Sequence, residues 1–283
     1  MAKNSNIEWT DATWNPWYGC NKVSPGCKHC YAERDMNRFD MNFSQVKRSK
    51  TKFDEPLKWD KPLEVFTCSW SDFFHGDADR WRTEAWDIIK NTPHFYRILT
   101  KRPENILDRL PKDWGDGYPN VMLVVSIENH DYVQRGYMLS RVPAQYRGIS
   151  AEPLIGELDL LDLLANSQFN EVIVGGESGM KNSRPCHPLW INKIRLHCEI
   201  AQVPFFFKQW GAWLPINSDD FPMEFDPTPV SKIKRMLSLH PTGKTSDNAE
   251  LTFPWIPMAK IGKQAAGRRF LGRIWDNKLN WRQ

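Results

Sequence analysis

Six short apolar runs recur along the first three quarters of the chain, and this repeat constrains the fold more than any other feature. They begin at residues 64, 96, 121, 146, 171 and 204, so successive starts lie 32, 25, 25, 25 and 33 residues apart. One strand–helix unit needs about 30 residues. Nearly continuous apolar runs are typical of parallel strands that are buried on both faces. The runs are Glu64–Ser69, Tyr96–Thr100, Val121–Ser126, Tyr146–Ser150, Glu171–Val174 and Pro204–Lys208.

Polar, helix-like stretches separate these runs, and a strand near Thr13–Gly19 with a helix from about Tyr31 to Asn42 begins the series. Seven such units fit a full or partial (β/α) barrel or an open doubly wound sheet. No glycine-rich dinucleotide loop follows the first strand, which disfavours the doubly wound sheet. We therefore predict an α/β fold built as a full or partial barrel. The expected helices are Asp79–Asn91, Pro103–Leu110, Asp131–Arg141, Gly156–Ala165 and Pro188–Gln202.

The repeat stops near Trp213, which predicts a barrel over residues 1–213 and an extension over residues 214–283 that packs on it. The segment Asn217–Pro229 is rich in Pro and Asp, as loops are. The whole chain has a net charge of +4, too small to indicate a nucleic-acid partner by itself. Lys260–Gln283, however, carries seven Lys/Arg and one Asp, a local net charge of +6.

This basic segment allows two interpretations. Its cations would contact nucleic-acid phosphates, and Trp275 or Trp281 would stack on a base. Alternatively, the segment is a solvated element whose aromatic side chains dock on the barrel. The phosphate candidates are Lys263, Arg268, Arg269 and Arg273.

Composition narrows the class of protein. The 283 residues include 14 tryptophans, which suit either base recognition or an aromatic core. No run approaches the roughly 20 apolar residues that span a bilayer, and the N-terminal residues lack the apolar segment of a signal peptide. We therefore expect a cytoplasmic protein of a bacterium or phage-infected host, without a membrane partner. In that compartment six cysteines indicate thiols, metal or catalysis rather than disulfides.

Compact polar groups follow the predicted strands, where active sites of barrel and open α/β folds gather. Any one of them would serve as a helix cap, but capping does not require the lysines, arginines and glutamates found there. They predict a polar pocket. Its candidates for catalysis are Lys101, Arg102, Glu177, Lys208 and Gln209.

The sharpest motif is a loop with the spacing C-x6-C-x2-C, formed by Cys20, Cys27 and Cys30 between the first strand and the first helix. Structural zinc normally has four ligands in a closed site, and His29 is poorly placed to be the fourth. A [4Fe–4S] cluster on three cysteines leaves one iron open. An open iron that binds S-adenosylmethionine (SAM) is the basis of radical-SAM chemistry.

With this loop and repeat, the chain resembles an uncharacterised phage and prophage family with a three-cysteine motif, of radical-SAM type. The matching stretches cover nearly the whole chain. They are NIEWTDATWNPWYGC, SPGCKHCYAE, SWSDFFH, TKRPE, VSIEN, SAEPLIG, VIVGGESG, FFKQWG and GKQAAGRRFLGRIWD. The C-x6-C-x2-C spacing departs from the commonest radical-SAM pattern, C-x3-C-x2-C.

The resemblance implies a [4Fe–4S] cluster on Cys20, Cys27 and Cys30, SAM as cofactor, and an electron donor such as flavodoxin or ferredoxin. His29 stands where such proteins often place an aromatic residue near the adenine. The second strand lacks the usual glycine-rich motif for the SAM amino group, and Asp72 is the substitute acceptor. The implied cofactor-binding residues are Ser69, Ser71, Asp72, Ser126, Glu128, Ser150, Glu152, Gly175 and Gly176.

Three functions remain open. The chain would be a radical-SAM enzyme acting on a nucleobase in DNA, RNA or a nucleotide. It would otherwise be a radical-SAM enzyme acting on another small molecule or a peptide. The third alternative is a zinc-bearing nucleic-acid-binding protein without catalysis, which predicts zinc, no iron and no SAM binding.

Overall fold

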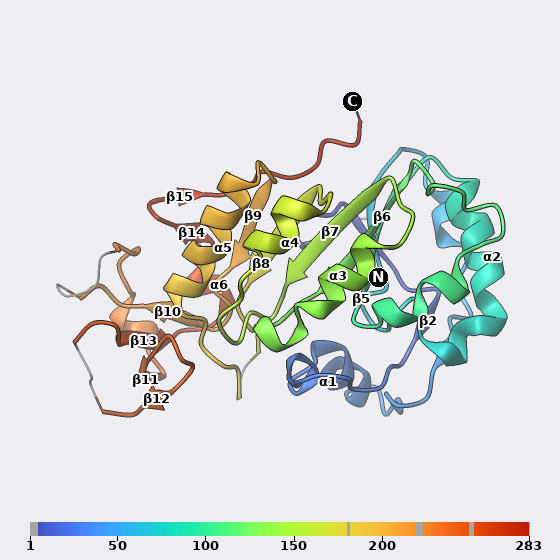
Figure 1. The fold of residues 1–283 in the computed structure, drawn as a ribbon. Helices are drawn as coiled ribbons and strands as arrows, with labels where there is room; N and C mark the ends of the chain where they lie inside the picture. The colour runs from blue at the N-terminus through green and yellow to red at the C-terminus, as the bar shows by residue number, and fades with distance from the viewer. Residues whose placement is uncertain (1–4, 180–181, 219–222, 249–251, 283) are drawn as a thin grey trace.

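The computed structural model describes residues 5–179, 182–218, 223–248 and 252–282. A sheet of seven parallel strands dominates it, in the order β1-β4-β5-β6-β7-β8-β9 (Figure 1). The strands are Ala12–Trp14 (β1), Glu64–Thr67 (β4), Phe95–Thr100 (β5), Val121–Ser126 (β6), Tyr146–Ala151 (β7), Glu171–Gly175 (β8) and Phe205–Gln209 (β9). All six predicted apolar runs are therefore strands, to within one or two residues at their ends.

The strand order follows the chain without a reversal, and every neighbouring pair is parallel. A doubly wound sheet would reverse its order at one point. An order without reversal is that of a (β/α) barrel. Over the described ranges no pairing joins β9 to β1, so the fold is a partial barrel.

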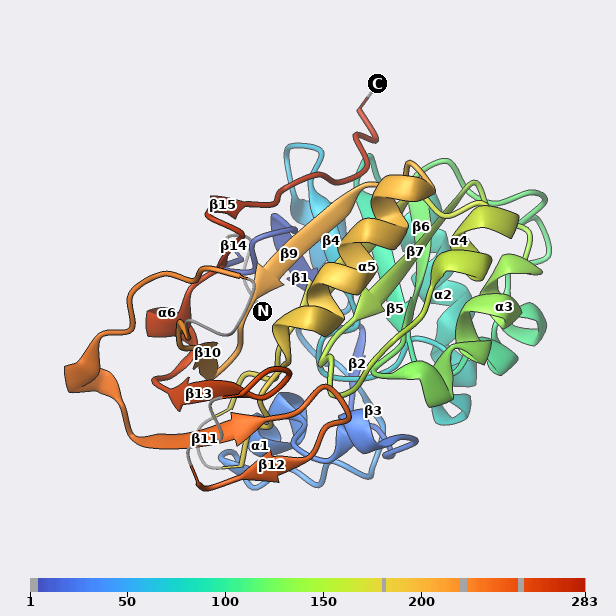
Figure 2. The same cartoon turned by 60° about the vertical axis from the view of Figure 1, so that its left-hand side comes forward.

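The helices are Tyr31–Asn37 (α1), Asp79–Lys90 (α2), Gln134–Ser140 (α3), Leu161–Asn166 (α4), Pro188–Ile200 (α5) and Lys263–Ala266 (α6). Helices α3, α4 and α5 lie over one face of the sheet (Figure 2). None of the helices in the described part of the chain is long and apolar enough to cross a membrane.

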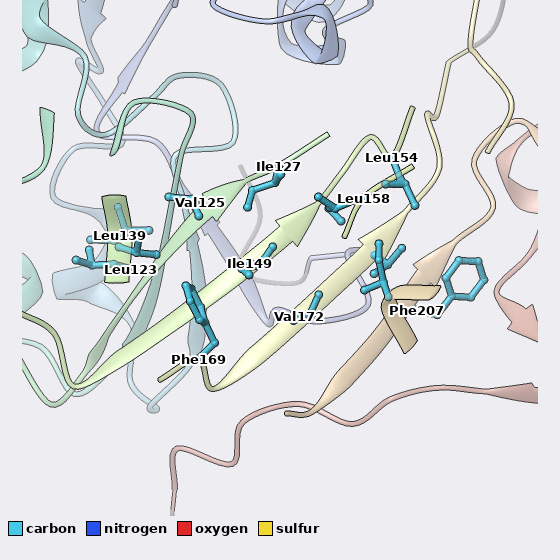
Figure 3. Packing of buried hydrophobic residues seen from close by; sticks show 14 of the residues in the cluster. Leu123, Val125, Ile127, Leu139, Ile149, Leu154, Leu158, Phe169, Val172 and Phe207 are labelled. Atoms are coloured by element: carbon cyan, nitrogen blue, oxygen red, sulfur yellow. The ribbon is translucent and has the colours of Figure 1, made fainter. Parts of the chain in front are cut away.

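The main core lies between these helices and the sheet. Leu123, Ile149 and Val172 point from their strands toward the helical side, where Leu139 of α3 packs (Figure 3). Alternate strand residues point to the other, concave face because successive side chains of a strand alternate. Ile173, for example, belongs to a separate small cluster with Trp9, Phe66 and Phe206. The helical face is therefore apolar, and the concave face is free to carry a site.

Four helix predictions differ from the structure. The helix predicted over residues 31–42 ends at Asn37, and the one predicted over residues 131–141 starts at Gln134, after a 3₁₀ turn at His130–Tyr132. The segment Pro103–Leu110 forms two short 3₁₀ turns, Pro103–Asn105 and Leu107–Arg109, instead of one helix. Short connections commonly adopt this tighter turn. Helix α4 starts only at Leu161, because the segment before it bonds to the loop after β6: His130 N–H donates to the Glu157 carbonyl (2.9 Å).

After β9 the architecture changes to short antiparallel strands. Sheet β10-β13-β11-β12 consists of Trp213–Pro215, Ile256–Lys260, Arg235–Leu239 and Thr245–Ser246, in that order. Two small pairs are β2 (Trp17–Tyr18) with β3 (Lys47–Arg48), and β14 (Arg269–Phe270) with β15 (Arg273–Ile274). The predicted loop 217–229 lies partly outside the described residues, and its described part contains no helix or strand.

The C-terminal segment packs at the amino ends of the strands, away from α1 (Figure 1). Trp281 stacks on Phe95 with ring centroids 5.2 Å apart, and its Nε1 donates to Glu64 (2.9 Å). The Phe207 N–H donates to the Trp275 carbonyl (3.0 Å), which covers the outer edge of β9. In this structure both tryptophans thus pack on the barrel.

A buried ion cluster lies under this segment on the concave face. The Arg97 guanidinium is fully buried, pairs with Glu171 and lies 3.7 Å from the Glu64 carboxylate. Burial raises the pKa of Glu171, and the Arg97 charge opposes that rise. Removing one member of such a cluster leaves buried charges without compensation.

We expect Arg97→Ala to lower the free energy of unfolding by about 3–5 kcal/mol, measured by chemical denaturation. The control is Arg235→Ala, because Arg235 pairs with Asp247 at 2.7 Å with side chains 57% and 76% exposed. That exposed pair is expected to contribute less than about 1 kcal/mol. Equal losses in the two variants would contradict a structural role for the buried cluster.

Candidate functional site

A cavity of about 210 Å³ opens at the carboxyl ends of the strands, on the concave face. Cys20, Cys27 and Cys30 all line it, and so does His29. The barrel thus brings the three-cysteine loop over the same cavity as the polar strand ends. Most predicted pocket residues line it as well: Ser69, Ser71, Asp72, Lys101, Arg102, Ser126, Ser150, Glu152, Gly176, Glu177, Lys208 and Gln209. Glu128 and Gly175 are absent from this lining.

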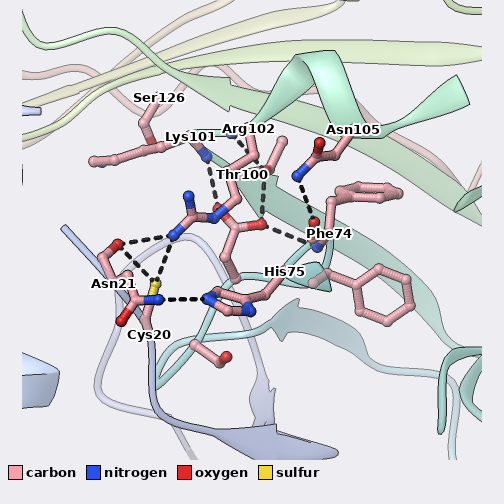
Figure 4. A network of polar contacts seen from close by, with 12 residues as sticks. Cys20, Asn21, Phe74, His75, Thr100, Lys101, Arg102, Asn105 and Ser126 are labelled. Atoms are coloured by element: carbon pink, nitrogen blue, oxygen red, sulfur yellow. Dashed lines mark hydrogen bonds and ion pairs between the residues drawn. The ribbon is translucent and has the colours of Figure 1, made fainter. Parts of the chain in front are cut away.

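Arg102, directly after β5, holds the start of the cysteine loop (Figure 4). Its Nη2 donates to the Asn21 carbonyl at 2.8 Å and lies 3.7 Å from the Cys20 sulfur. Burial, with the Asp72 charge, raises the pKa of Cys20 to about 12, although Arg102 acts in the opposite direction. Burial also raises the pKa of Cys30. These thiols therefore stay protonated until a metal displaces their protons.

Glu128, at the end of β6, holds the middle of the loop. Its buried carboxylate accepts from the Ser24 hydroxyl (2.6 Å) and from Arg135 Nη1 (2.7 Å), and Lys101 Nζ lies at 3.4 Å. Despite burial, the neighbouring Lys101 and Arg135 charges lower the pKa of Glu128. A Cβ on Gly26 would lie 2.4 Å from Glu128 Cγ, so only glycine fits there. Glu128 thus contacts the loop and is absent from the cavity lining, and its contact with SAM stays a prediction.

Glu177, after β8, holds the loop through an arginine that sequence reasoning missed. The Arg184 Nε and backbone N–H donate to Glu177 Oε2 at 2.9 and 2.8 Å, and Nη2 donates to Oε1 at 2.5 Å. Arg184 Nη1 then donates to the Pro25 carbonyl (3.0 Å). No motif marks Arg184, because the two segments it joins are 159 residues apart.

The residues after β4 make mostly internal bonds. Asp72 accepts from the Thr100 hydroxyl (2.7 Å) and from the backbone N–H groups of Phe74 (3.0 Å) and Lys101 (2.9 Å). The Ser71 hydroxyl donates to the Gly19 carbonyl (2.6 Å), and Ser69 accepts from Asn15 Nδ2 (2.8 Å). A carboxylate has about four acceptor sites. Asp72 therefore keeps some capacity for a ligand.

Other parts of the chain lie close to Gly175, the last residue of β8, and to Gly176, which follows it. An added Cβ would lie 2.5 Å from Glu152 Oε1 at Gly175 and 2.0 Å from the Trp210 carbonyl oxygen at Gly176. Glu152 in turn pairs with Lys208 Nζ at 3.0 Å. The Glu152 side chain therefore occupies the position that a side chain at residue 175 would take, and the Trp210 backbone occupies that position at residue 176.

The basic candidates of the C-terminal segment lie outside the cavity lining. Lys263 lies 3.7 Å from Glu8, Arg269 lies 3.2 Å from Asp226, and Arg268 pairs with Asp276. The Arg273 guanidinium lies 3.5 Å from the centroid of the Trp275 ring. Their binding of nucleic acid stays a prediction.

Comparison with known proteins identifies the family. The profile described as "Protein of unknown function (DUF5131)" matches residues 4–278. The chain belongs to the DUF5131 family. A search of curated proteins found no match for this DUF5131 chain.

Among solved structures, the chain is similar to a mutant of spore photoproduct lyase with bound AdoMet and dinucleoside spore photoproduct. The two are 12% identical, with a TM-score of 0.43. The match covers 69% of this chain and 62% of that chain, less than two thirds of its length. A likeness this distant assigns no residue and no substrate to the DUF5131 chain.

We expect Gly26→Ala to loosen the cysteine loop, because its Cβ must displace Glu128 or the loop. Loss of a charge-assisted hydrogen bond costs about 1.5–3 kcal/mol, so amide exchange over residues 20–30 should accelerate at least about tenfold. Hydrogen exchange with mass spectrometry measures this. The control is Gly179→Ala, whose Cβ would meet its nearest neighbour, Ser183 Cβ, at 4.0 Å. Unchanged exchange in Gly26→Ala would refute this packing role.

Proposed function

We propose that this protein is a radical-SAM enzyme in which Cys20, Cys27 and Cys30 hold a [4Fe–4S] cluster. The observation that carries the proposal is that three thiols from one short loop line a single cavity at the carboxyl ends of a partial barrel. Arg102 and Glu128 after two strand ends, and Arg184 paired with Glu177 after a third, hold that loop. If these residues only capped helices, the charges of Arg102, Glu128 and Glu177 would not be required.

The donor set fits the cluster in type and number. Thiolates are the ligands that iron–sulfur clusters prefer, and three of them leave one iron for SAM. Among the described residues, no group of three or more His, Cys, Asp or Glu side chains stands in a metal-binding arrangement. The three sulfurs would therefore have to turn toward one another on loading, with release of the Cys20 and Cys30 protons.

When bound, the cluster and SAM would supply one-electron cleavage of the sulfonium and hydrogen-atom abstraction from substrate. The side chains of the protein would position the cysteine loop, SAM and the substrate. Ser126 and Ser150 are register partners on β6 and β7 and line the cavity, so both hydroxyls suit the polar groups of SAM. Arg102 and Glu177 would hold the loop. Lys101, Lys208 and Gln209 remain as candidates to contact substrate, and a flavodoxin or ferredoxin would supply the electron.

The proposed substrate is a nucleobase in DNA, RNA or a nucleotide, which the enzyme would modify or repair. The support is the local charge of +6 in residues 260–283, together with exposed arginines such as Arg269 and Arg273. The alternative substrate is another small molecule or a peptide, with the basic segment serving only to pack on the barrel.

A second candidate is the zinc-bearing protein, and Cys68 is the observation that favours it. Cys68 follows β4, is 3% exposed and lines the same cavity as the three loop cysteines. Four cysteines would satisfy a closed zinc site. Zinc without iron that persists after attempted cluster reconstitution, and is lost in Cys68→Ala, would favour this candidate over the enzyme.

We expect about four irons and four sulfides per chain in protein prepared without oxygen, with SAM cleavage to 5′-deoxyadenosine on reduction. Cys20→Ala, Cys27→Ala and Cys30→Ala should each abolish cleavage and lower the iron content. Cys186→Ala is the control, because Cys186 is fully buried in the main core and outside the cavity lining. Full cleavage by the triple alanine variant would overturn the proposal.

If the substrate is a nucleic acid, we expect the protein to bind single-stranded DNA or RNA with an affinity that falls as the salt concentration rises. Each phosphate contact adds roughly 0.7 to the slope of log affinity against log salt for single strands. The double variant Arg269→Ala/Arg273→Ala should therefore lower that slope by about 1.4. Arg80→Ala is the control, because the Arg80 guanidinium packs on Trp81 as Arg273 packs on Trp275. An unchanged slope in the double variant favours the non-nucleic substrate.

A further inference from the structure

The indole of Trp9 forms part of the cavity wall and has an unused donor. Trp9 is 1% exposed and packs on Phe66, with ring centroids 5.0 Å apart, in the small cluster on the concave face. Its Nε1 is buried without a hydrogen-bond partner among the described residues. Buried indole N–H groups usually have a partner. A donor left over on a cavity wall points to a ligand that accepts from it.

Gln209 has an unused acceptor on the same cavity. It is 4% exposed, and its Oε1 is buried without a partner among the described residues. Its Nε2 lies 3.5 Å from the Gly176 carbonyl oxygen. This contact orients the Gln209 amide so that Oε1 is the atom left without a partner. Two residues that line the cavity thus each carry one buried polar atom without a partner among the described residues, a donor on Trp9 and an acceptor on Gln209.

A bulge in β9 explains how Gln209 comes to line the cavity. Val174 pairs with Phe207, but Gly175 pairs with Gln209, so Lys208 is an extra residue on β9. Regular alternation would turn only one of two successive side chains toward the concave face. With the bulge, both Lys208 and Gln209 line the cavity. Bulges beside active sites commonly redirect a side chain in this way.

We propose that Trp9 and Gln209 form a subsite for the edge of a nucleobase. Every base carries a hydrogen-bond acceptor beside a donor on its Watson–Crick edge, which complements an indole N–H and an amide oxygen. A single trans peptide group fits less well, because its C=O and N–H point in opposite directions. The flat apolar surroundings of Trp9, including Phe66 and Leu99, suit a base ring.

This subsite adds a binding site for the substrate base to the proposed function. Assigning the bound base to the substrate rests on that proposed function. The same edge chemistry is present in the adenine of SAM, so two sources of the base exist. Binding is measured without turnover, by calorimetry on protein of known metal content. A failure of the radical-SAM proposal, such as zinc in place of iron, is therefore distinct from a failure of the subsite.

The experiment measures binding of AMP, CMP, GMP, UMP and SAM, with ribose 5-phosphate as the ligand that lacks a base. Trp9→Phe removes the donor and keeps a ring, and Gln209→Met removes the acceptor at similar length. Each should weaken binding of at least one nucleotide about 3- to 10-fold, as expected for one lost hydrogen bond. Binding of ribose 5-phosphate should not change.

Matched controls separate the subsite from general damage. Trp190→Phe removes an indole N–H that already bonds to the Pro241 carbonyl, and Gln145→Met removes an amide that bonds to Gly117 outside the cavity. Both should leave nucleotide binding unchanged. Circular dichroism checks the fold of each variant. If Trp9→Phe does not fold, Gln209→Met tests the same subsite from the other side.

The outcomes are distinct. Weaker nucleotide binding with unchanged SAM affinity supports the subsite and assigns it to a substrate base. An equal loss for SAM in both variants supports the nucleobase chemistry and assigns the base to the cofactor, which overturns the substrate assignment. Wild-type protein that binds none of these bases, or variants that bind them as tightly as wild type, would overturn the subsite itself.

Discussion

Charged side chains linked to three strand ends hold the cysteine loop, and the arrangement of the site depends on them. Arg102 bonds to Asn21, and Glu128 to Ser24, while Glu177 reaches Pro25 through Arg184. The loop has little regular structure of its own, with one 3₁₀ turn at Pro25–Cys27. Charge-assisted hydrogen bonds are stronger than neutral ones, so they add to the apolar packing of Cys20 and Cys30 against Ala32, Met36 and Phe43.

The two ends of the barrel use buried charge for different purposes. At the amino ends, Arg97 balances Glu171 and Glu64 under the packed C-terminal segment, which bonds to both carboxylates. At the carboxyl ends, the side chains surround a cavity and leave single polar atoms unpaired, such as Trp9 Nε1 and Gln209 Oε1. Arg97 Nε and Nη2 at the amino ends also lack a hydrogen-bond partner among the described residues, but Arg97 is outside the cavity lining, whereas Trp9 and Gln209 belong to it.

Sequence reasoning found the strands because their apolar runs recur at one spacing, and it found the cavity because polar residues follow those runs. It did less well on individual roles. Glu128 was expected to contact SAM; its carboxylate accepts from Ser24 and Glu128 is absent from the cavity lining, so that contact stays a prediction. Arg184 was missed because it lies neither at a strand end nor in a motif, and Trp9 because it precedes the first strand, although it lies in the stretch NIEWTDATWNPWYGC. Pairwise contacts across more than a hundred residues leave no local pattern to read.

The sequence by itself determined the strand–helix repeat, the place of the cysteine loop after the first strand and the polar character of the strand ends. These follow from local periodicity and from the rule that parallel strands end together. Only the tertiary structure decided that the barrel stays open, that Trp275 and Trp281 pack on it, and which strand-end side chains hold the loop. Those outcomes depend on which strands pair and on side-chain direction, which no spacing along the chain encodes.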